Sequence, residues 1–284
     1  MSFTNIDSLI KMSIDKDIFQ IIIEDDMSQR GVDYNESFNK MCTMWEAMKD
    51  SVRKYDRTII SNSGLSGTDA GRIKDYREQN ATLAGDFIMK VMETAVAVAE
   101  SNACMKRIVA APTAGSCGVL PAVLVPFYEE KQCDDTQCIK ALYVAAAIGE
   151  VIAHRASISG AQCGCQAEIG AASAMSACAL TYIRGGNVLQ IMNAGAMALK
   201  NLLGLTCDPV GGYVEVPCVK RNVIGAVNAI TSSEMALAGV TSKIPFDEVI
   251  DAMGEIGEKM DSSLKETGKG GLAATPTGML YGMH

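Results

Sequence analysis

Four of the ten cysteines stand in turns where the backbone could direct a thiolate towards a metal, namely Cys163, Cys165, Cys207 and Cys218. Soft thiolate ligands favour zinc in a cysteine-only site or an iron–sulfur cluster. A zinc finger is the weaker interpretation, because the sequence has only two histidines and lacks C-x-x-C spacing. One residue separates Cys163 from Cys165, so we expect one thiol to face the cofactor and the other to pack in the core. On the residues alone, cysteine-only zinc and a cluster remain alternatives.

The other cysteines are expected to have a different role. Free cysteine is among the most buried residue types. We therefore interpret as small core residues the five that lie in or beside helical patterns: Cys42, Cys104, Cys133, Cys138 and Cys178. Cys117 lies in a tight turn between Ser116 and Gly118, and its local sequence favours neither role.

The N-terminal residues 1–7 contain no cationic segment followed by an apolar run, so no secretory signal is predicted. Cysteines of a protein that is not exported stand in a reducing compartment, where metal binding or burial is more common than a disulfide. We therefore expect a cytoplasmic location. The net charge of −8, without a basic stripe, argues against a nucleic-acid partner.

A membrane-spanning segment must be considered, because no residue between Arg107 and Glu129 is charged. Three prolines, Pro112, Pro121 and Pro126, would interrupt a spanning helix repeatedly. A buried loop followed by a buried helix is the better interpretation, and we expect no contact with a membrane.

The elements that must position these residues are mainly helical. Apolar residues at helical spacing predict amphipathic helices in the first ~60 residues, and then a turn or binding loop at 61–69 and a helix at 82–105. From 110 to 239 small and aliphatic residues dominate, with helices predicted at 138–154, 168–183, 188–203 and 222–238. A short strand is a weak possibility at 213–216, and a final helix at 247–267 would end at Gly268. These patterns predict a mainly α protein with a single helical domain over 1–284, in which residues 1–80 form a more polar part and 81–284 an Ala/Gly-rich buried core.

Several polar residues could hold a small anionic substrate. The loop with Thr113, Gly115 and Ser116 precedes an apolar helix, where backbone N–H groups and hydroxyls could bind an anion or cap the helix. Ser157 and Ser159 allow the same two interpretations, and Lys269, in a glycine-rich segment, could pair with a carboxylate or be solvated.

Two further side chains are expected to stabilise helix ends. We expect Glu168 to cap a helix N-terminus more readily than to bind a substrate ammonium group. His154, at the end of an Ala-rich helix, is expected to interact with the last carbonyl groups of that helix.

Five segments together resemble the α chain of the bacterial iron–sulfur-dependent L-serine dehydratases. They are 111–121 (APTAGSCGVLP), 157–168 (SISGAQCGCQAE), 201–212 (NLLGLTCDPVGG), 216–218 (VPC) and 266–273 (ETGKGGLA). The resemblance spans most of the chain and implies a mainly α-helical part that binds a [4Fe–4S] cluster through three cysteines. The matching positions are Cys165, Cys207 and Cys218, which lie 42 and 11 positions apart. The resemblance thus ranks Cys165 above Cys163.

The sequence differs from single-chain relatives of that family in two respects. Those relatives carry an additional domain with a Ser- and His-rich substrate motif, and a C-terminal cysteine that caps the fourth iron at rest. Here no such domain precedes the α region, and the sequence ends Gly282-Met283-His284. The resemblance therefore implies the two-subunit form, in which a β chain supplies the missing domain, and it leaves the resting fourth iron ligand open.

The implied activity is elimination of water from L-serine, which gives pyruvate and ammonia after tautomerisation and hydrolysis. An open iron could act as a Lewis acid on the hydroxyl group, and a positioned base must remove the Cα proton. Because histidine is scarce, we expect the base to come from the β chain, and no catalytic residue is assigned here. The alternatives are a related lyase acting on L-cysteine or L-threonine, a cluster-binding redox or sensor subunit, and a structural subunit with inert cysteines.

Overall fold

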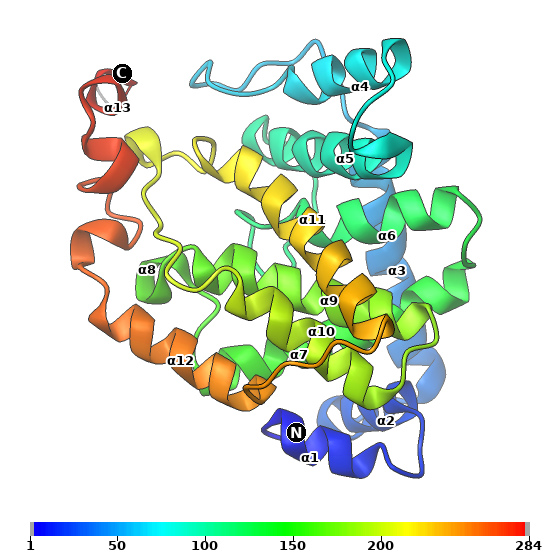
Figure 1. The fold of residues 1–284 in the computed structure, drawn as a ribbon. Helices are drawn as coiled ribbons and strands as arrows, with labels where there is room; N and C mark the ends of the chain where they lie inside the picture. Colours follow the sequence, from blue (N-terminus) through cyan, green and yellow to red (C-terminus); the bar gives the residue numbers. More distant parts are fainter. Residues whose placement is uncertain (1–2, 282–284) are drawn as a thin grey trace.

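Helices supply the regular structure of residues 3–281, the part of the chain described by this computed structural model (Figure 1). No β-strand occurs in this range, which confirms the mainly α prediction and a single helical domain. The division at residue 80 stays a prediction.

Three N-terminal helices confirm the amphipathic segments expected in the first ~60 residues. They are α1 (Ile6–Met12), α2 (Ile18–Arg30) and α3 (Tyr34–Arg53). Each begins at a residue whose side chain accepts a hydrogen bond from a backbone amide of the first turn, namely Asn5, Asp17 and Asp33. Helices α2 and α3 pack against α7 (Asp135–Arg155) at the lower right of Figure 1.

The next helices lie over the upper part of the molecule. Helix α4 (Asp69–Gln79) packs on α5 (Gly85–Ala103), which corresponds to the helix predicted at 82–105. A loop then leads into α6 (Val119–Glu129), whose residues from Val119 to Pro126 are all buried. The prediction of a buried helix over this charge-free stretch is therefore confirmed.

Helix α9 (Ala171–Ile183) lies at the centre of the core, and its residues from Ala171 to Thr181 are all buried. It contacts α6, α7, α10 (Val188–Lys200) and α11 (Cys218–Leu237). Small side chains allow these helix backbones to approach closely. At Gly195 of α10 an added Cβ would overlap the Phe246 ring and the Cys178 sulfur, so glycine is required there.

The C-terminal helices differ from the sequence prediction. Helix α12 (Phe246–Lys259) ends eight residues before 267, because Met260 is extended and Asp261 accepts a hydrogen bond from the Ser263 amide. Gly268 is therefore not its C-cap. Short helical turns follow, listed in chain order as η3 (Ser262–Leu264), η4 (Gly271–Ala274) and α13 (Pro276–Tyr281).

The strand considered at 213–216 is wrong. The segment after the short turn η2 (Val210–Gly212) folds back on itself, since the Val210 amide donates to the Val216 carbonyl at 2.9 Å. The Glu215 amide donates to the Tyr213 carbonyl at 2.8 Å. These local bonds occupy groups that a neighbouring strand would need.

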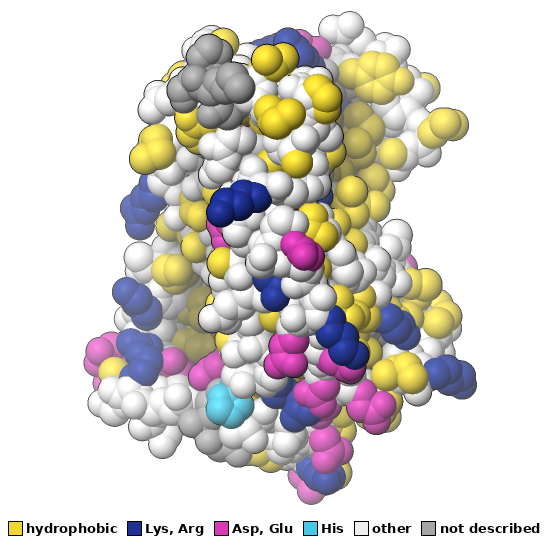
Figure 2. Space-filling model, turned by 90° about the vertical axis from the view of Figure 1, so that its left-hand side faces the viewer, with side chains coloured by type: hydrophobic (Ala, Val, Ile, Leu, Met, Phe, Trp, Pro, Cys, Tyr) yellow, Lys and Arg dark blue, Asp and Glu magenta, His cyan; other side chains and the backbone are white. Residues whose placement is uncertain are grey.

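One described helix, α7, is long and apolar enough to cross a membrane by length and composition, and 67% of its most apolar window is buried inside the protein. It packs against α2, α3 and α9, as a core helix does. The face shown in Figure 2 carries acidic and basic side chains mixed over its lower half, and hydrophobic side chains gather near its top.

Candidate functional site

Three buried thiols at the ends of helical elements lie within electrostatic reach of one another. Cys165 directly precedes the π-helical turn η1 (Gln166–Gly170), Cys207 lies in the loop after α10, and Cys218 is the first residue of α11. Their exposed fractions are only 2%, 3% and 6%. Burial raises the pKa of the Cys165 thiol to about 11 and that of Cys218 to about 12. The pKa of Cys207 is raised by burial and then by the negative charges of Glu168 and Cys165, so these groups lie within electrostatic reach of one another.

The donors of the site are thiols, which suit an iron–sulfur cluster. Among residues 3–281, no three His, Cys, Asp or Glu side chains are arranged to hold one metal ion. The three thiols have no histidine beside them, and deprotonated together without a metal they would repel one another in a buried site. Cysteine thiolates without histidine partners are the ligands of iron–sulfur clusters. The residues present therefore fit such a group.

Cys163 and Cys165 have different surroundings. Gly164 between them has a left-handed φ of 74°, which turns the chain between the two cysteines. The Cys163 sulfur lies against Gly257 of α12, where an added Cβ would overlap it. Cys163 is therefore a packing residue on the α12 side.

Arg221 places a positive charge beside the thiols. Its guanidinium donates to the Thr206 carbonyl at 2.6 Å and to Asp208 Oδ1 at 2.9 Å. It also interacts with Cys165, and this interaction lowers the pKa of that thiol against the larger effect of burial. The sequence analysis missed Arg221, although it follows Cys218 by three positions and therefore lies on the same face of α11.

The Cys207 loop is held by the C-terminal part of the chain. The Cys207 amide donates to the Leu264 carbonyl at 2.8 Å, and the Cys207 carbonyl accepts from the Glu266 amide at 2.7 Å. The buried Asp208 carboxylate also accepts from the Leu272 amide at 2.8 Å. Main-chain bonds therefore fix this thiol from both sides.

Glu168 is the carboxylate of the site. Its Oε1 accepts a hydrogen bond of 2.7 Å from Thr113 Oγ1, and its Oε2 lies 3.8 Å from Cys207 Sγ. Burial raises the pKa of the Glu168 carboxyl. The prediction that Glu168 caps a helix is wrong: α9 has no side-chain cap, and the carboxylate instead joins segments 55 positions apart.

The loop before α6 brings polar groups to this carboxylate. The hydroxyls of Thr113 and Ser116 lie 3.1 Å apart, and an added Cβ at Gly115 would lie 3.3 Å from Glu168 Oε1. Asn222 of α11 fixes the loop, because its side chain accepts from the Gly118 amide and donates to the Gly115 carbonyl, both at 2.9 Å. Within residues 3–281, the Ala114 and Gly115 amides donate to no protein acceptor.

The other residues predicted to bind substrate are Ser157, Ser159 and Lys269. Ser157 Oγ donates to Gln162 at 2.7 Å and accepts from the Ser159 amide at 3.0 Å, which is a local turn. Ser159 is the N-cap residue of α8 (Gly160–Cys163) but makes no side-chain cap bond. Lys269 is exposed, and no ion pair joins it to another described residue.

The residue after Ser159 approaches the site closely. An added Cβ at Gly160 would lie 2.7 Å from Glu168 Oε2 and 3.0 Å from Cys207 Sγ. Gly160 therefore marks a close backbone contact with both groups, which the sequence analysis did not identify.

Residues 3–281 contain one histidine, His154, and no hydrogen bond or ion pair joins it to the groups of the site. His154 is exposed in the last turn of α7, the region of the helix C-terminus where it was expected. The prediction about the chain end Gly282-Met283-His284 lies outside the described residues.

A serine-rich loop at 61–69 adjoins the segment that leads to Cys218. The buried Glu215 carboxylate accepts from Ser61 Oγ at 2.6 Å and from Ser63 Oγ at 2.8 Å. Since Glu215 precedes Cys218 by only three positions, the loop is anchored next to a thiol of the site.

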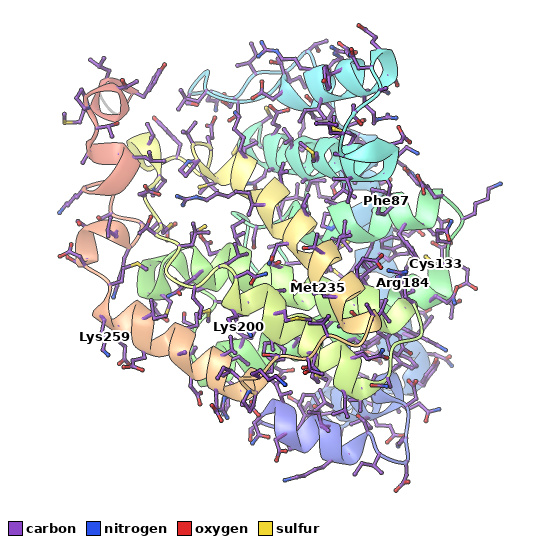
Figure 3. The ribbon with its side chains drawn as sticks, viewed as in Figure 1. Phe87, Cys133, Arg184, Lys200, Met235 and Lys259 are labelled. Atoms are coloured by element: carbon purple, nitrogen blue, oxygen red, sulfur yellow. The ribbon has the colours of Figure 1, made fainter. Side chains whose placement is uncertain are left out.

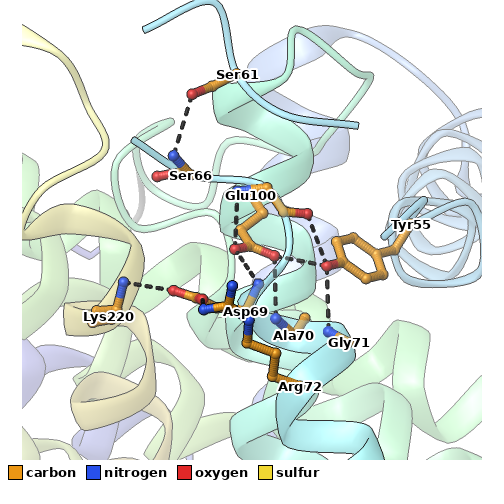
Figure 4. A network of polar contacts seen from close by, with 10 residues as sticks. Tyr55, Ser61, Ser66, Asp69, Ala70, Gly71, Arg72, Glu100 and Lys220 are labelled. Atoms are coloured by element: carbon orange, nitrogen blue, oxygen red, sulfur yellow. Dashed lines mark hydrogen bonds and ion pairs between the residues drawn. The ribbon is translucent and has the colours of Figure 1, made fainter. Parts of the chain in front are cut away.

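The base of this loop is fixed by a buried carboxylate on α5 (Figure 4). Glu100 accepts from the amides of Gly67, Asp69 and Ala70 at 3.0, 2.8 and 3.2 Å. Tyr55 donates to the same carboxylate at 2.8 Å. Negative charge at the start of α4 is favourable to the helix dipole, so Glu100 holds the loop and helix together.

Comparison with known proteins identifies the family. The family described as Serine dehydratase alpha chain matches residues 14–273. A probable L-serine dehydratase, alpha chain, of Bacillus subtilis is 47% identical over 281 residues, which are 97% of this chain and 93% of the relative. The L-serine dehydratase, alpha chain, of Peptoniphilus asaccharolyticus is 40% identical over 92% of this chain and 90% of its own. An L-serine dehydratase of Haemophilus influenzae is 48% identical over 63% of this chain but only 40% of its own length. The chain belongs to the serine dehydratase alpha chain family.

Proposed function

We propose that this chain is the α subunit of an enzyme that eliminates water from L-serine, and that it holds a [4Fe–4S] cluster through Cys165, Cys207 and Cys218. The observation that carries the proposal is that these three buried thiols lie within electrostatic reach of one another and of the Glu168 carboxylate, which is bonded to the loop before α6. The names of the relatives support serine as the substrate.

A cluster with three cysteine ligands supplies, when bound, an iron that can act as a Lewis acid. Arg221 offsets part of the negative charge that three thiolates bring into a buried site. It is held in place by Asp208 and the Thr206 carbonyl. The chain thus supplies both the ligands and a compensating cation.

The polar groups around Glu168 are suited to an amino-acid substrate. We assign the Glu168 carboxylate to the substrate ammonium group, because it is the acidic side chain next to the thiols. The Ala114 and Gly115 amides, which have no protein acceptor among residues 3–281, are assigned to the substrate carboxylate. The Thr113 hydroxyl orients Glu168 for this task.

The base that removes the Cα proton is assigned to a β chain. The "alpha chain" names of the relatives support a second subunit, and the longer Haemophilus influenzae protein has room for a further domain. Several exposed hydrophobic side chains follow Leu264 and Glu266, the residues that bond to Cys207, and would suit such a contact. They are Leu272, Met279, Leu280 and Tyr281. A cytoplasmic location is also proposed, because the cysteines are free and not joined in disulfides.

The test is anaerobic co-expression with a β chain, followed by iron analysis and a pyruvate assay with L-serine. We expect about four irons per αβ pair and activity that is lost in air. Cys165→Ala should abolish both, whereas the matched control Cys163→Ala, on the α12 side, should retain both. Iron that survives Cys165→Ala would contradict the ligand assignment.

The same assay separates the remaining alternatives. L-Threonine gives 2-oxobutyrate, and L-cysteine gives pyruvate with sulfide, so the products identify the substrate. A cluster that is reversibly reduced but turns over none of the three amino acids would indicate a redox or sensor subunit. Full turnover by the purified α chain alone would overturn the assignment of the base to a partner.

A further inference from the structure

Two cysteines outside the candidate active site occupy linked positions at the start of α7. Asp134 is the N-cap, and it forms a capping box with Gln137, in which each side chain accepts from the other's amide at 2.8 and 3.0 Å. Cys133 precedes the cap and Cys138 is the fourth residue of the helix. These are the two positions whose side chains pack together as a hydrophobic staple. Here both members of the staple carry a thiol.

The staple brings the two sulfurs into contact. Cys133 Sγ lies 3.3 Å from Cys138 Sγ. Cys138 is fully buried, whereas Cys133 is half-buried. The neighbouring residue Gln132 lines a cleft of about 580 Å³ together with Phe87 and Arg184, and Figure 3 labels Cys133 on the same side of the molecule as Arg184. Because Cys133 is only half-buried, a small oxidant can reach its thiol, and the Cys138 thiol is already its neighbour.

We propose that Cys133 and Cys138 form a reversible disulfide when the protein meets a peroxide, so that the staple of α7 is a redox-active pair. The inference is independent of the proposed lyase activity, since neither cysteine belongs to the candidate active site.

The chemistry assigns separate roles to the two thiols. The hydrogen bond from the Cys138 thiol lowers the pKa of Cys133, which favours the thiolate that attacks peroxides. Attack on hydrogen peroxide forms an S–O bond, breaks the O–O bond and releases hydroxide, which takes up the proton lost by Cys133. The Cys138 sulfur then attacks the sulfenic sulfur of Cys133, forms the S–S bond and releases water with its own proton. The two thiols lose two electrons in total, and the peroxide is reduced to two waters.

The test uses the full chain, purified anaerobically and exposed to increasing hydrogen peroxide before alkylation and digestion with trypsin. Cleavage after Lys131 and Lys140 gives one peptide, QCDDTQCIK, that contains both cysteines and no other. We expect this peptide to lose two hydrogens and to resist alkylation, and dithiothreitol to restore it. The half-buried single thiols Cys42 and Cys104 fall in separate peptides and serve as internal references.

The folded geometry is tested by repeating the exposure in denaturant. We expect the disulfide to form at roughly tenfold lower peroxide in the folded chain than in the unfolded one, because the staple holds the sulfurs together. Cys138→Ala should leave Cys133 as a sulfenic acid that a dimedone probe labels, while Cys133→Ser should leave Cys138 unreacted. A pair that stays reduced while the Cys42 and Cys104 peptides are oxidised would overturn the proposal. Equal oxidation of the folded and unfolded chains would overturn it too.

Discussion

The Thr113 hydroxyl donates a hydrogen bond of 2.7 Å to Glu168 Oε1, and this contact joins the loop before α6 to the π-helical turn after Cys165. The bond makes Thr113 a positioning residue, since it sets the direction of a carboxylate that lies 3.8 Å from the Cys207 thiol.

Thr113→Val, which keeps the shape but removes the hydroxyl, should therefore lower kcat/KM for L-serine by about 10–100-fold, the usual effect of losing an orienting partner. Thr113→Ser keeps the donor and should restore most of the activity. Steady-state kinetics of the anaerobic αβ enzyme measures this, with iron content as the control. A variant that loses iron in proportion to activity would show that the contact is structural only.

Gly160 allows the site to be perturbed without changing a ligand. An alanine Cβ would lie 2.7 Å from Glu168 Oε2 and 3.0 Å from Cys207 Sγ, distances that require one of these groups to move. We expect Gly160→Ala to reduce cluster loading and activity together. The matched control is Gly254→Ala in α12, where the nearest atom would be the Ala156 Cβ at 3.3 Å. Equal iron content in both variants would contradict the predicted contact.

Glu215 should control the mobility of the loop at 61–69. Its carboxylate accepts hydrogen bonds from the hydroxyls of Ser61 and Ser63. A hydrogen bond to a charged group contributes about 1.5–3 kcal/mol to stability. Glu215→Ala should therefore speed amide hydrogen exchange in residues 61–66 while leaving α9 unchanged. Glu248→Ala, at an exposed position of α12, provides the comparison. Unaltered exchange in the loop would mean that Glu100 alone holds it.

Asp135 makes the packing of α3 on α7 depend on pH. Burial acts to raise its pKa, but hydrogen bonds from Lys49 at 2.7 Å and Trp45 at 2.6 Å outweigh burial and lower the pKa. The stabilisation is therefore complete above the unfolded pKa of roughly 3.9 and is lost as the pH falls through the lower folded value. Asp135→Asn should destabilise the protein at pH 7, and the difference from wild type should shrink in acid. Urea unfolding across this range measures it, and a difference independent of pH would exclude the mechanism.

Much of the helical fold can be predicted from the sequence because it follows local rules. Apolar spacing and small residues identify α7, α9, α10 and α11. In α6, Pro121 stands in the first turn, where a missing N–H costs nothing, and the helix also accommodates Pro126 in its interior. The end of α12 could not be found in the same way. Residues 260–267 keep a helical pattern, but Asp261 caps a new turn and the chain leaves to pair with Cys207. Tertiary contacts outweigh local propensity there.

The three cysteines can be singled out from the sequence, and their role as ligands stays a prediction, whereas the groups around them could not be predicted. Sequence motifs identify the cysteines. The role of Glu168 depends on its partner Thr113, which is 55 positions away, so the local sequence predicts a helix cap instead. Arg221 and Glu215 were missed for a similar reason: each acts through contacts with distant segments. For Arg221 the helical spacing from Cys218 was a usable signal. For Gly160 the sequence carries no such signal, since its close contact with Glu168 and Cys207 exists only in the folded chain.

The main-chain bonds that hold Cys207 come from Leu264 and Glu266. During synthesis on the ribosome, a chain that has reached Cys218 already carries all three thiols, yet it lacks the residues that fix the second of them. The three thiols are therefore synthesised before the residues that hold Cys207 in place. If the chain holds the cluster proposed above, a cluster offered to the nascent chain would meet an unformed site until residues 264–266 have been synthesised.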